Sequence, residues 1–175
     1  MDAPPSRGAV QGFAPVAAPD ARILVLGSMP GVASLRRAQY YAHPRNAFWP
    51  IAADALGFDA ALHYDARLRA LRAAGVALWD VLAGCVRPGS LDADIRREGL
   101  APNDFPAFLA AHAGIRRICF NGAKAAALFA RHVRPALPPR AQALEFVALP
   151  STSPAHAAMP YEEKRRRWRE ALTGV

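Results

Sequence analysis

The sequence predicts an α/β fold in which a parallel sheet is covered on both faces by helices. Two observations support this prediction. Short apolar runs alternate along the chain with longer stretches that place apolar residues at helical spacing. The connections between them are short, as expected for parallel strands joined by crossover helices. With 175 residues, 53% of them hydrophobic and 21% charged, the chain can bury a core as one domain.

Each expected element has its own local signal. The first strand is an apolar run that stops at Gly27, which suits a strand buried in a parallel sheet. The second helix carries Leu68 and Leu71 on one side and arginines on the other, and the Ala-rich fourth helix is stopped by the prolines of 135–139. The expected strands span 23–26, 76–82, 117–120 and 144–149, and the expected helices span 47–56, 65–74, 105–113, 124–133 and 161–172.

The N-terminal residues 1–19 are rich in alanine, proline and glycine and lack the apolar core of a signal peptide. We expect them to form a flexible arm, followed by a single domain over residues 20–175. No apolar run approaches the roughly 20 residues that span a bilayer. We therefore expect a cytoplasmic protein without a membrane partner.

Charge and cysteine content narrow the functional classes. A net charge of +8 is typical of proteins that bind phosphate, although an arginine-rich composition in general would explain it as well. Two cysteines, Cys85 and Cys119, are too few for an iron–sulfur cluster and are expected to be buried. His43 and His156 have no evident metal-ligating partner, so we expect neither a metal ion nor another cofactor.

The turn Gly27-Ser28-Met29-Pro30-Gly31 follows the first expected strand, where ligands of open α/β sheets bind. Glycines at both ends permit a sharp turn, and free backbone N–H groups there can donate to a carbonyl or phosphate oxygen. The turn matches neither a P-loop nor a dinucleotide fingerprint. An ordinary strand-to-loop turn is the alternative. Other segments that follow expected strands are 80–92, 121–124 and 150–156.

The segment from Gln39 to Trp49 brings together aromatic, basic and amide side chains. Tyr41 could stack on a base, Asn46 could pair with a base edge, and Arg45 could hold a phosphate. Phe48 and Trp49 are better explained as core residues, and Asn46 could instead be only a helix N-cap.

Two later segments are also candidates for contact with nucleic acid. The loop from Leu149 to His156 is a stiff, polar protrusion that could enter a minor groove, or a plain loop rich in proline and serine. The basic stretch 164–169 on the last helix suits a solvated face with Trp168 packed inward, or contact with a nucleic-acid backbone.

In this order, the GSMPG turn, the YYAHPRNAFW segment and the LPSTSP loop resemble the uracil-DNA glycosylase superfamily, and within it the hypoxanthine-DNA (deoxyinosine) glycosylase family. The resemblance covers roughly Arg22 to Trp168. It implies a three-layer αβα fold around a four-stranded parallel sheet. It also implies a monomeric repair enzyme that flips a deaminated base, hypoxanthine before others, out of double-stranded DNA and hydrolyses its N-glycosidic bond. The alternatives are a uracil or mismatch-specific glycosylase, or a catalytically weak module that binds damaged DNA.

The resemblance also assigns roles to residues. Met29 stands where most members carry an Asn or Asp that handles water, and Leu149 stands where a His or Asn is frequent, so Asn46 is the expected catalytic residue. The expected base-binding residues are Gly27, Ser28, Met29, Pro30, Gly31, Tyr41 and Asn121. The expected DNA contacts are His43, Arg45, Ser151, Thr152, Ser153 and His156, and further candidates are Ser90, Asp92 and Lys124. Asp92 could act as a base toward water or could cap a helix.

Overall fold

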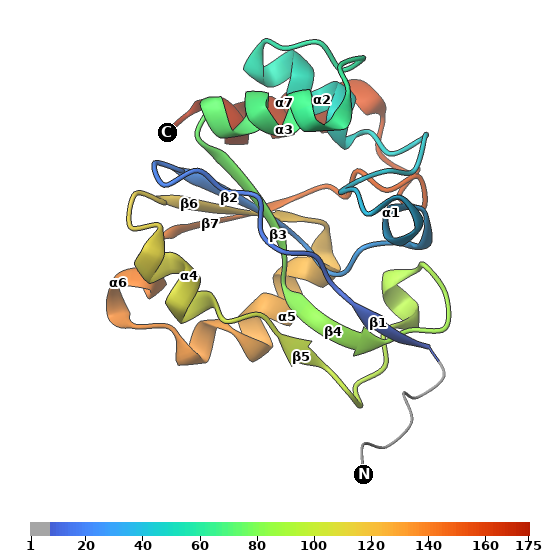
Figure 1. Cartoon of the computed structure of the whole chain (residues 1–175), viewed down its shortest axis with the longest axis vertical. Coiled ribbons are helices and arrows are strands. Elements are labelled where there is room, and N and C mark those ends of the chain that lie inside the picture. Colours follow the sequence, from blue (N-terminus) through green and yellow to red (C-terminus); the bar gives the residue numbers. More distant parts are fainter. Residues whose placement is uncertain (1–7) are drawn as a thin grey trace.

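The computed structural model describes residues 8–175, and its centre is a four-stranded parallel sheet in the order β3-β2-β6-β7 (Figure 1). The strands are β2 (Ile23–Gly27), β3 (Val76–Asp80), β6 (Arg117–Asn121) and β7 (Glu145–Leu149). All of β2 is buried, because it pairs with β3 on one side and β6 on the other and is covered on both faces. The expected αβα fold with four parallel strands is confirmed.

Helices form a layer on each face of this sheet (Figure 1). One layer contains α2 (Phe48–Leu56), α3 (Tyr64–Ala73) and α7 (Tyr161–Thr173), and the other contains α4 (Phe105–Ala111), α5 (Ala123–His132) and α6 (Pro139–Gln142). Side chains alternate across a strand. Leu24 and Leu26 therefore join the core beneath α4 and α5, whereas Ile23 and Val25 join the core beneath α2, α3 and α7. Two separate hydrophobic cores hold the sheet in place.

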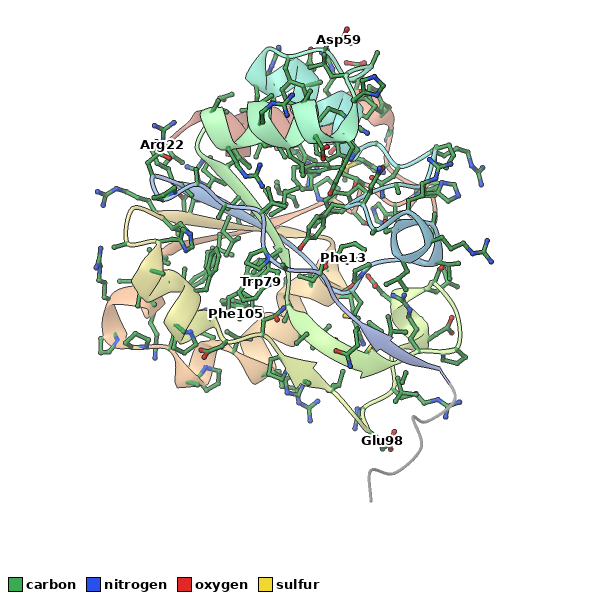
Figure 2. The ribbon with its side chains drawn as sticks, in the orientation of Figure 1. Phe13, Arg22, Asp59, Trp79, Glu98 and Phe105 are labelled. Carbon is green, nitrogen blue, oxygen red and sulfur yellow. The ribbon has the colours of Figure 1, made fainter. Side chains whose placement is uncertain are left out.

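The N-terminal segment differs from the expected flexible arm. Residues 1–7 lie outside the described residues. Beyond them, β1 (Ala9–Gln11) pairs with β4 (Leu82–Val86), and Val16 is buried and bridges to Leu78. The indole N–H of Trp79 donates to the Phe13 carbonyl at 3.1 Å, and Figure 2 shows these two residues near the centre of the molecule. The expectation is wrong for residues 9–16, whose backbone groups and apolar side chains find partners on the domain.

The sequence predicted one strand over residues 76–82, but the structure divides this run between two strands. The parallel strand β3 ends at Asp80, and after Val81 the chain enters β4. β4 lies between β1 and β5 (Ala101–Pro102) in a small antiparallel sheet. Apart from Asp80, the run is apolar, because residues on both sides of Val81 are buried. This change of sheet leaves Asp80 at the carboxyl end of β3, beside Gly27 of the central strand β2.

The connections contain three further short elements. The segment between β2 and α2, expected to be a loop, contains the helix α1 (Val32–Arg37), and later come the 3-10 turns η1 (Asp92–Asp94) and η2 (Arg134–Ala136). Within residues 8–175, every helix is too short or too polar to cross a bilayer.

Candidate active site

The carboxyl ends of the four parallel strands lie at one edge of the sheet, as the sequence predicted. The strand register places Gly27 beside Asp80 and Asn121 beside Leu149. The loops that leave these ends stay in contact, since the Gly122 N–H donates to the Leu149 carbonyl at 3.0 Å. We call the residues gathered at this edge the strand-end site: Gly27–Gly31, Tyr41, Asp80, Arg87, Asn121 and Thr152.

The turn after β2 is braced by the loop that follows β4. The buried Ser28 hydroxyl donates to the Asp92 carboxylate, the Arg87 guanidinium donates to the Pro30 carbonyl, and the Val32 N–H donates to the Ser90 hydroxyl at 2.8 Å. Ser90 and Asp92 thus position the turn.

The side chains of two expected base contacts in this turn are directed into the protein. Met29 is buried in the core beneath α4 and α5, and the Ser28 hydroxyl is occupied by Asp92. Within the described part of the chain, the N–H groups of Ser28, Met29 and Gly31 have no acceptor. The turn therefore offers backbone N–H donors to a ligand, whereas the Ser28 and Met29 side chains stabilise the fold.

Tyr41 is held in a left-handed backbone conformation, with a φ of 54°, which is uncommon for a residue other than glycine. Its ring lies 4.2 Å from the ring of Phe48, with an interplanar angle of 32°. Its hydroxyl is buried without a hydrogen-bond partner among the described residues. Burial, and then the negative charge of Asp80, raise the pKa of this hydroxyl well above its ordinary value. Tyr41 is therefore a neutral aromatic side chain with an unused hydroxyl donor.

Asn46 lies one residue before Ala47, the N-cap of α2, so it is not the N-cap that one interpretation of the sequence required. Its side-chain carbonyl accepts the Phe48 N–H at 2.9 Å. The side chain is half-buried, and its NH2 group donates to no residue in the described range 8–175. The hydrogen bond to Phe48 therefore fixes the orientation of the side chain and leaves two N–H donors available.

Asn121 and Thr152 hold each other at the ends of β6 and β7. The Asn121 amide donates to the Thr152 hydroxyl at 2.8 Å, and its carbonyl accepts the Thr152 N–H at 2.9 Å. The Thr152 carbonyl accepts the Ala47 N–H at 3.0 Å. Thr152 is only 1% exposed, so it supports Asn121 and does not lie on the DNA-facing surface where we expected it.

Asp80 and Arg87 lie in the expected segment 80–92, but the sequence pattern assigned neither of them a role of its own. Asp80 is 3% exposed, and its Oδ2 atom has no hydrogen-bond partner in the part of the chain that the structure describes. Burial first, and then the Asp92 charge, raise the pKa of this carboxyl to about 7, and Arg87 opposes the shift. Arg87 is also buried, and its Nη1 atom lacks a partner. The available signal was an acidic residue that ends an otherwise apolar strand run.

Buried polar atoms without partners are concentrated in this site. Four such side-chain atoms occur in the described residues, and three of them belong to Tyr41, Asp80 and Arg87. Most buried polar atoms in native proteins are hydrogen-bonded, so such a cluster indicates a place for a polar ligand or water.

Comparison with known proteins identifies the family and the fold. The family model "Uracil DNA glycosylase superfamily" matches residues 14–173. The chain belongs to this superfamily. Two relatives named hypoxanthine DNA glycosylase are similar to it: one from Methanosarcina barkeri is 38% identical over 65% of this chain and 72% of the relative, and one from Methanosarcina acetivorans is 36% identical over 83% and 87%.

A solved structure agrees with these relatives. It is the solution NMR structure of a candidate uracil DNA glycosylase from Methanosarcina acetivorans, with a TM-score of 0.79 and 32% identity over 94% of this chain and 96% of that one. The expected superfamily and enzyme class are thereby confirmed, and this chain is a DNA glycosylase.

The loop of this glycosylase that follows β7 turns some side chains outward. His156 is exposed, and Ser151 and Ser153 are half-buried. Buried Lys164 donates from Nζ to the His156 carbonyl at 2.9 Å, and the Trp168 indole donates to the Pro150 carbonyl at 2.9 Å. Helix α7 thus fixes both ends of the loop.

Other expected residues lie elsewhere. His43 and Arg45 are exposed before α2, whereas Lys124 lines a separate pocket beside α5, which also contains Ile95, Arg97, Leu100, Arg131 and His132. Within the described residues, no three His, Cys, Asp or Glu side chains are grouped to hold a metal ion.

The basic stretch 164–169 on α7 forms a solvated face with Trp168 packed inward, the first of the two interpretations of the sequence. Arg165 pairs with Glu162 and Asp54, Arg166 with Glu170, and Arg167 with Glu163. Trp168 is fully buried. These arginines stabilise the helix surface and its contact with α2.

Proposed function

We propose that this chain is a hypoxanthine DNA glycosylase, which removes the deaminated purine from double-stranded DNA and so begins base excision repair. The observation that carries the proposal is the pair of relatives with this name at 38% and 36% identity. The site supports it, because buried Met29 leaves the first turn without a side chain that handles water. In this proposal the enzyme acts as a cytoplasmic monomer on chromosomal DNA.

The proposed chemistry divides the site between sugar and base. As the N-glycosidic bond breaks, positive charge develops on the sugar and negative charge on the departing base. The half-exposed Asn46 orients the attacking water or the adjacent sugar, with its hydrogen bond to Phe48 keeping it in place. The free N–H groups of the turn at Ser28–Gly31 donate to the base carbonyl. Tyr41 stacks on the base with the ring face that Phe48 does not cover, and Asn121 contacts the base edge.

The proposed DNA contacts are the exposed and half-buried side chains at the edge of the strand-end site. Arg45 and His43 suit backbone phosphates beside the flipped nucleotide. The loop after β7 enters the helix through Ser151, Ser153 and His156, supported from behind by Lys164. Lys124 extends the basic surface along α5.

The test is single-turnover excision from duplexes that contain one inosine, uracil or xanthine. We expect inosine to be cut fastest, and Asn46→Ala to lower the rate on the order of 100-fold or more, as loss of a fixed donor does. Asn46→Ser is the matched control, because a serine hydroxyl can still accept the Phe48 N–H two residues on but has no NH2 group. Equal loss in both variants, with stability retained in Asn46→Ser, supports a role of the amide in catalysis. Wild-type excision by Asn46→Ala contradicts it.

A uracil-specific enzyme is the second candidate, favoured by the name of the solved relative. The same panel decides between the two, because a uracil enzyme cuts the uracil duplex fastest. Binding to the inosine duplex without formation of an abasic site would instead identify a catalytically weak binding module.

A further inference from the structure

The Asp80 carboxylate is buried in the site, and its Oδ2 atom has no partner among the described residues. Gly27 lies beside it, and a Cβ atom at residue 27 would be 2.6 Å from Asp80 Oδ1 and 3.4 Å from the Tyr41 hydroxyl. The carboxylate therefore occupies the space that any other residue at position 27 would fill. Its Oδ2 atom is buried and has no partner in residues 8–175. An acceptor in this state is costly unless a ligand or water supplies a donor.

The position of Asp80 suits the base and not the sugar. It lies next to Gly27, which begins the turn whose N–H groups face the base carbonyl in the proposed mechanism, and on the same side of Gly27 as the hydroxyl of Tyr41, the residue that stacks on the base. Asn46, which serves the sugar side, is half-buried, whereas Asp80 is 3% exposed. Asp80 is the more deeply buried of the two residues, and the base is the part of a flipped nucleotide that enters the protein most deeply. Asp80 is therefore matched to the base.

Deamination changes the hydrogen-bonding edge of a base in one consistent way. Adenine has an acceptor at ring N1 beside an amino donor, and hypoxanthine has a donor N1–H beside a carbonyl acceptor. The change from cytosine to uracil reverses N3 and the exocyclic group in the same manner. A site that combines a carboxylate with backbone N–H donors complements the deaminated edge and opposes the original one. Guanine shares the N1–H edge, so this pair of contacts does not exclude it.

We infer that the Asp80 carboxylate recognises a deaminated base, by accepting the ring N–H that deamination creates while the N–H groups of the 28–31 turn donate to the new carbonyl. This role rests on the proposed function and makes Asp80 a residue that determines specificity. Arg87, whose guanidinium is buried nearby, favours the charged form of the carboxylate.

The role predicts a pH dependence with a definite sign. Burial raises the pKa of Asp80 to about 7, the Asp92 carboxylate adds to the shift, and Arg87 opposes it. Above this pH the carboxylate accepts the N–H of hypoxanthine. As the pH falls through about 7, Asp80 gains a proton and becomes a donor, which suits N1 of adenine. Preference for inosine over adenine therefore decreases toward acid pH.

The experiment measures this preference as binding, without excision. Duplexes carry one 2′-fluoro-2′-deoxyinosine or one 2′-fluoro-2′-deoxyadenosine opposite thymine, since fluorinated sugars resist hydrolysis. The ratio of the two dissociation constants is compared between wild type and Asp80→Asn, so that the cost of opening each base pair cancels. We expect Asp80→Asn to reduce the preference for inosine by roughly 10- to 100-fold, the range for a lost charged hydrogen bond. The asparagine amide accepts from hypoxanthine less strongly and also donates to adenine.

Asp94→Asn is the matched control, because Asp94 is a half-buried carboxylate in η1 that takes no part in the site. It should keep the wild-type preference and pH profile. An unchanged preference in Asp80→Asn, or a wild-type preference that is constant between about pH 5.5 and 8.5, overturns the inference. The pH series decides the question if Asp80→Asn does not fold. If the wild type fails to excise inosine, the proposed function fails, and the binding ratio still decides the role of Asp80.

Discussion

The strand-end site and helix α7 are both rich in polar groups, but they satisfy those groups in opposite ways. On α7, Arg165, Arg166 and Arg167 each pair with a carboxylate on the surface. In the strand-end site, Asp80 and Arg87 are buried and each keeps one atom without a partner. Satisfied surface pairs contribute little beyond local stability, whereas unsatisfied buried groups are costly and persist where a ligand completes them. Hydrogen-bond partners, and not charge density, distinguish the functional region from the structural one.

The largest expected effect comes from disturbing the unsatisfied group itself. Gly27→Ala places a Cβ atom 2.6 Å from Asp80 Oδ1, closer than two such atoms can approach. The turn or the carboxylate must move, and misplacement of this size in an active site costs on the order of 100-fold in rate. Single-turnover excision of inosine from duplex DNA measures it.

Gly57→Ala is the corresponding control at the end of α2. Gly57 has a φ of 78° and no atom within 4 Å of a Cβ position, so alanine there is strained but meets no neighbour. It should lower stability by about 1–2 kcal/mol and leave the excision rate of the folded protein unchanged. If Gly27→Ala kept the wild-type rate, the close approach of Asp80 would have no functional importance.

A smaller effect is expected from the clamp between Asn121 and Thr152. Thr152→Val removes the hydroxyl that accepts from the Asn121 amide at 2.8 Å and leaves a buried donor without a partner. Unfolding free energy should fall by about 1–2 kcal/mol. Thr173→Val provides the comparison on α7, where the exposed hydroxyl donates to the Arg169 carbonyl at 2.7 Å and the loss should be below about 0.5 kcal/mol. Denaturant unfolding of both variants measures the difference, and equal losses would contradict the distinction between the regions.

The sequence predicted the architecture well, because the spacing of its apolar residues indicates which residues are buried in strands and helices. Wholly apolar runs before Gly27 and Asn121 became central parallel strands, and helices alternated with them as expected. The switch from β3 to β4 could not be predicted, because it changes the pairing partner without changing the apolar pattern. Pairing of residues 9–11 with β4 was missed for the same reason, since it depends on contacts distant in sequence.

The candidate site was predicted in part, and the misses have a common physical cause. Residue type suggested that Thr152 and Ser28 face a ligand, yet both hydroxyls are used inside the protein. Asp80 lay in the expected segment 80–92 but had no assigned role, because the pattern does not show that its carboxylate lies against Gly27 with no partner among residues 8–175. Tertiary geometry decides which polar groups have hydrogen-bond partners. The strand-end site and α7 differ in this geometry, and the sequence pattern does not contain it.

The smallest effect concerns charges on the surface. Arg45 is exposed before α2, and no carboxylate within residues 8–175 pairs with it, whereas Arg166 is paired with Glu170 at 3.0 Å. Arg45→Ala should weaken binding to any duplex by several-fold and reduce the slope of log affinity against log salt by roughly one, as loss of one phosphate contact does. Arg166→Ala should change stability by less than about 0.5 kcal/mol and leave the salt slope unaltered. Fluorescence anisotropy with undamaged duplex across a salt series measures both slopes. The slope of log affinity against log salt depends on the charges that contact phosphate, and not on charges that are paired with carboxylates of the protein. A slope that is reduced only in Arg166→Ala would therefore place the DNA-binding surface on α7.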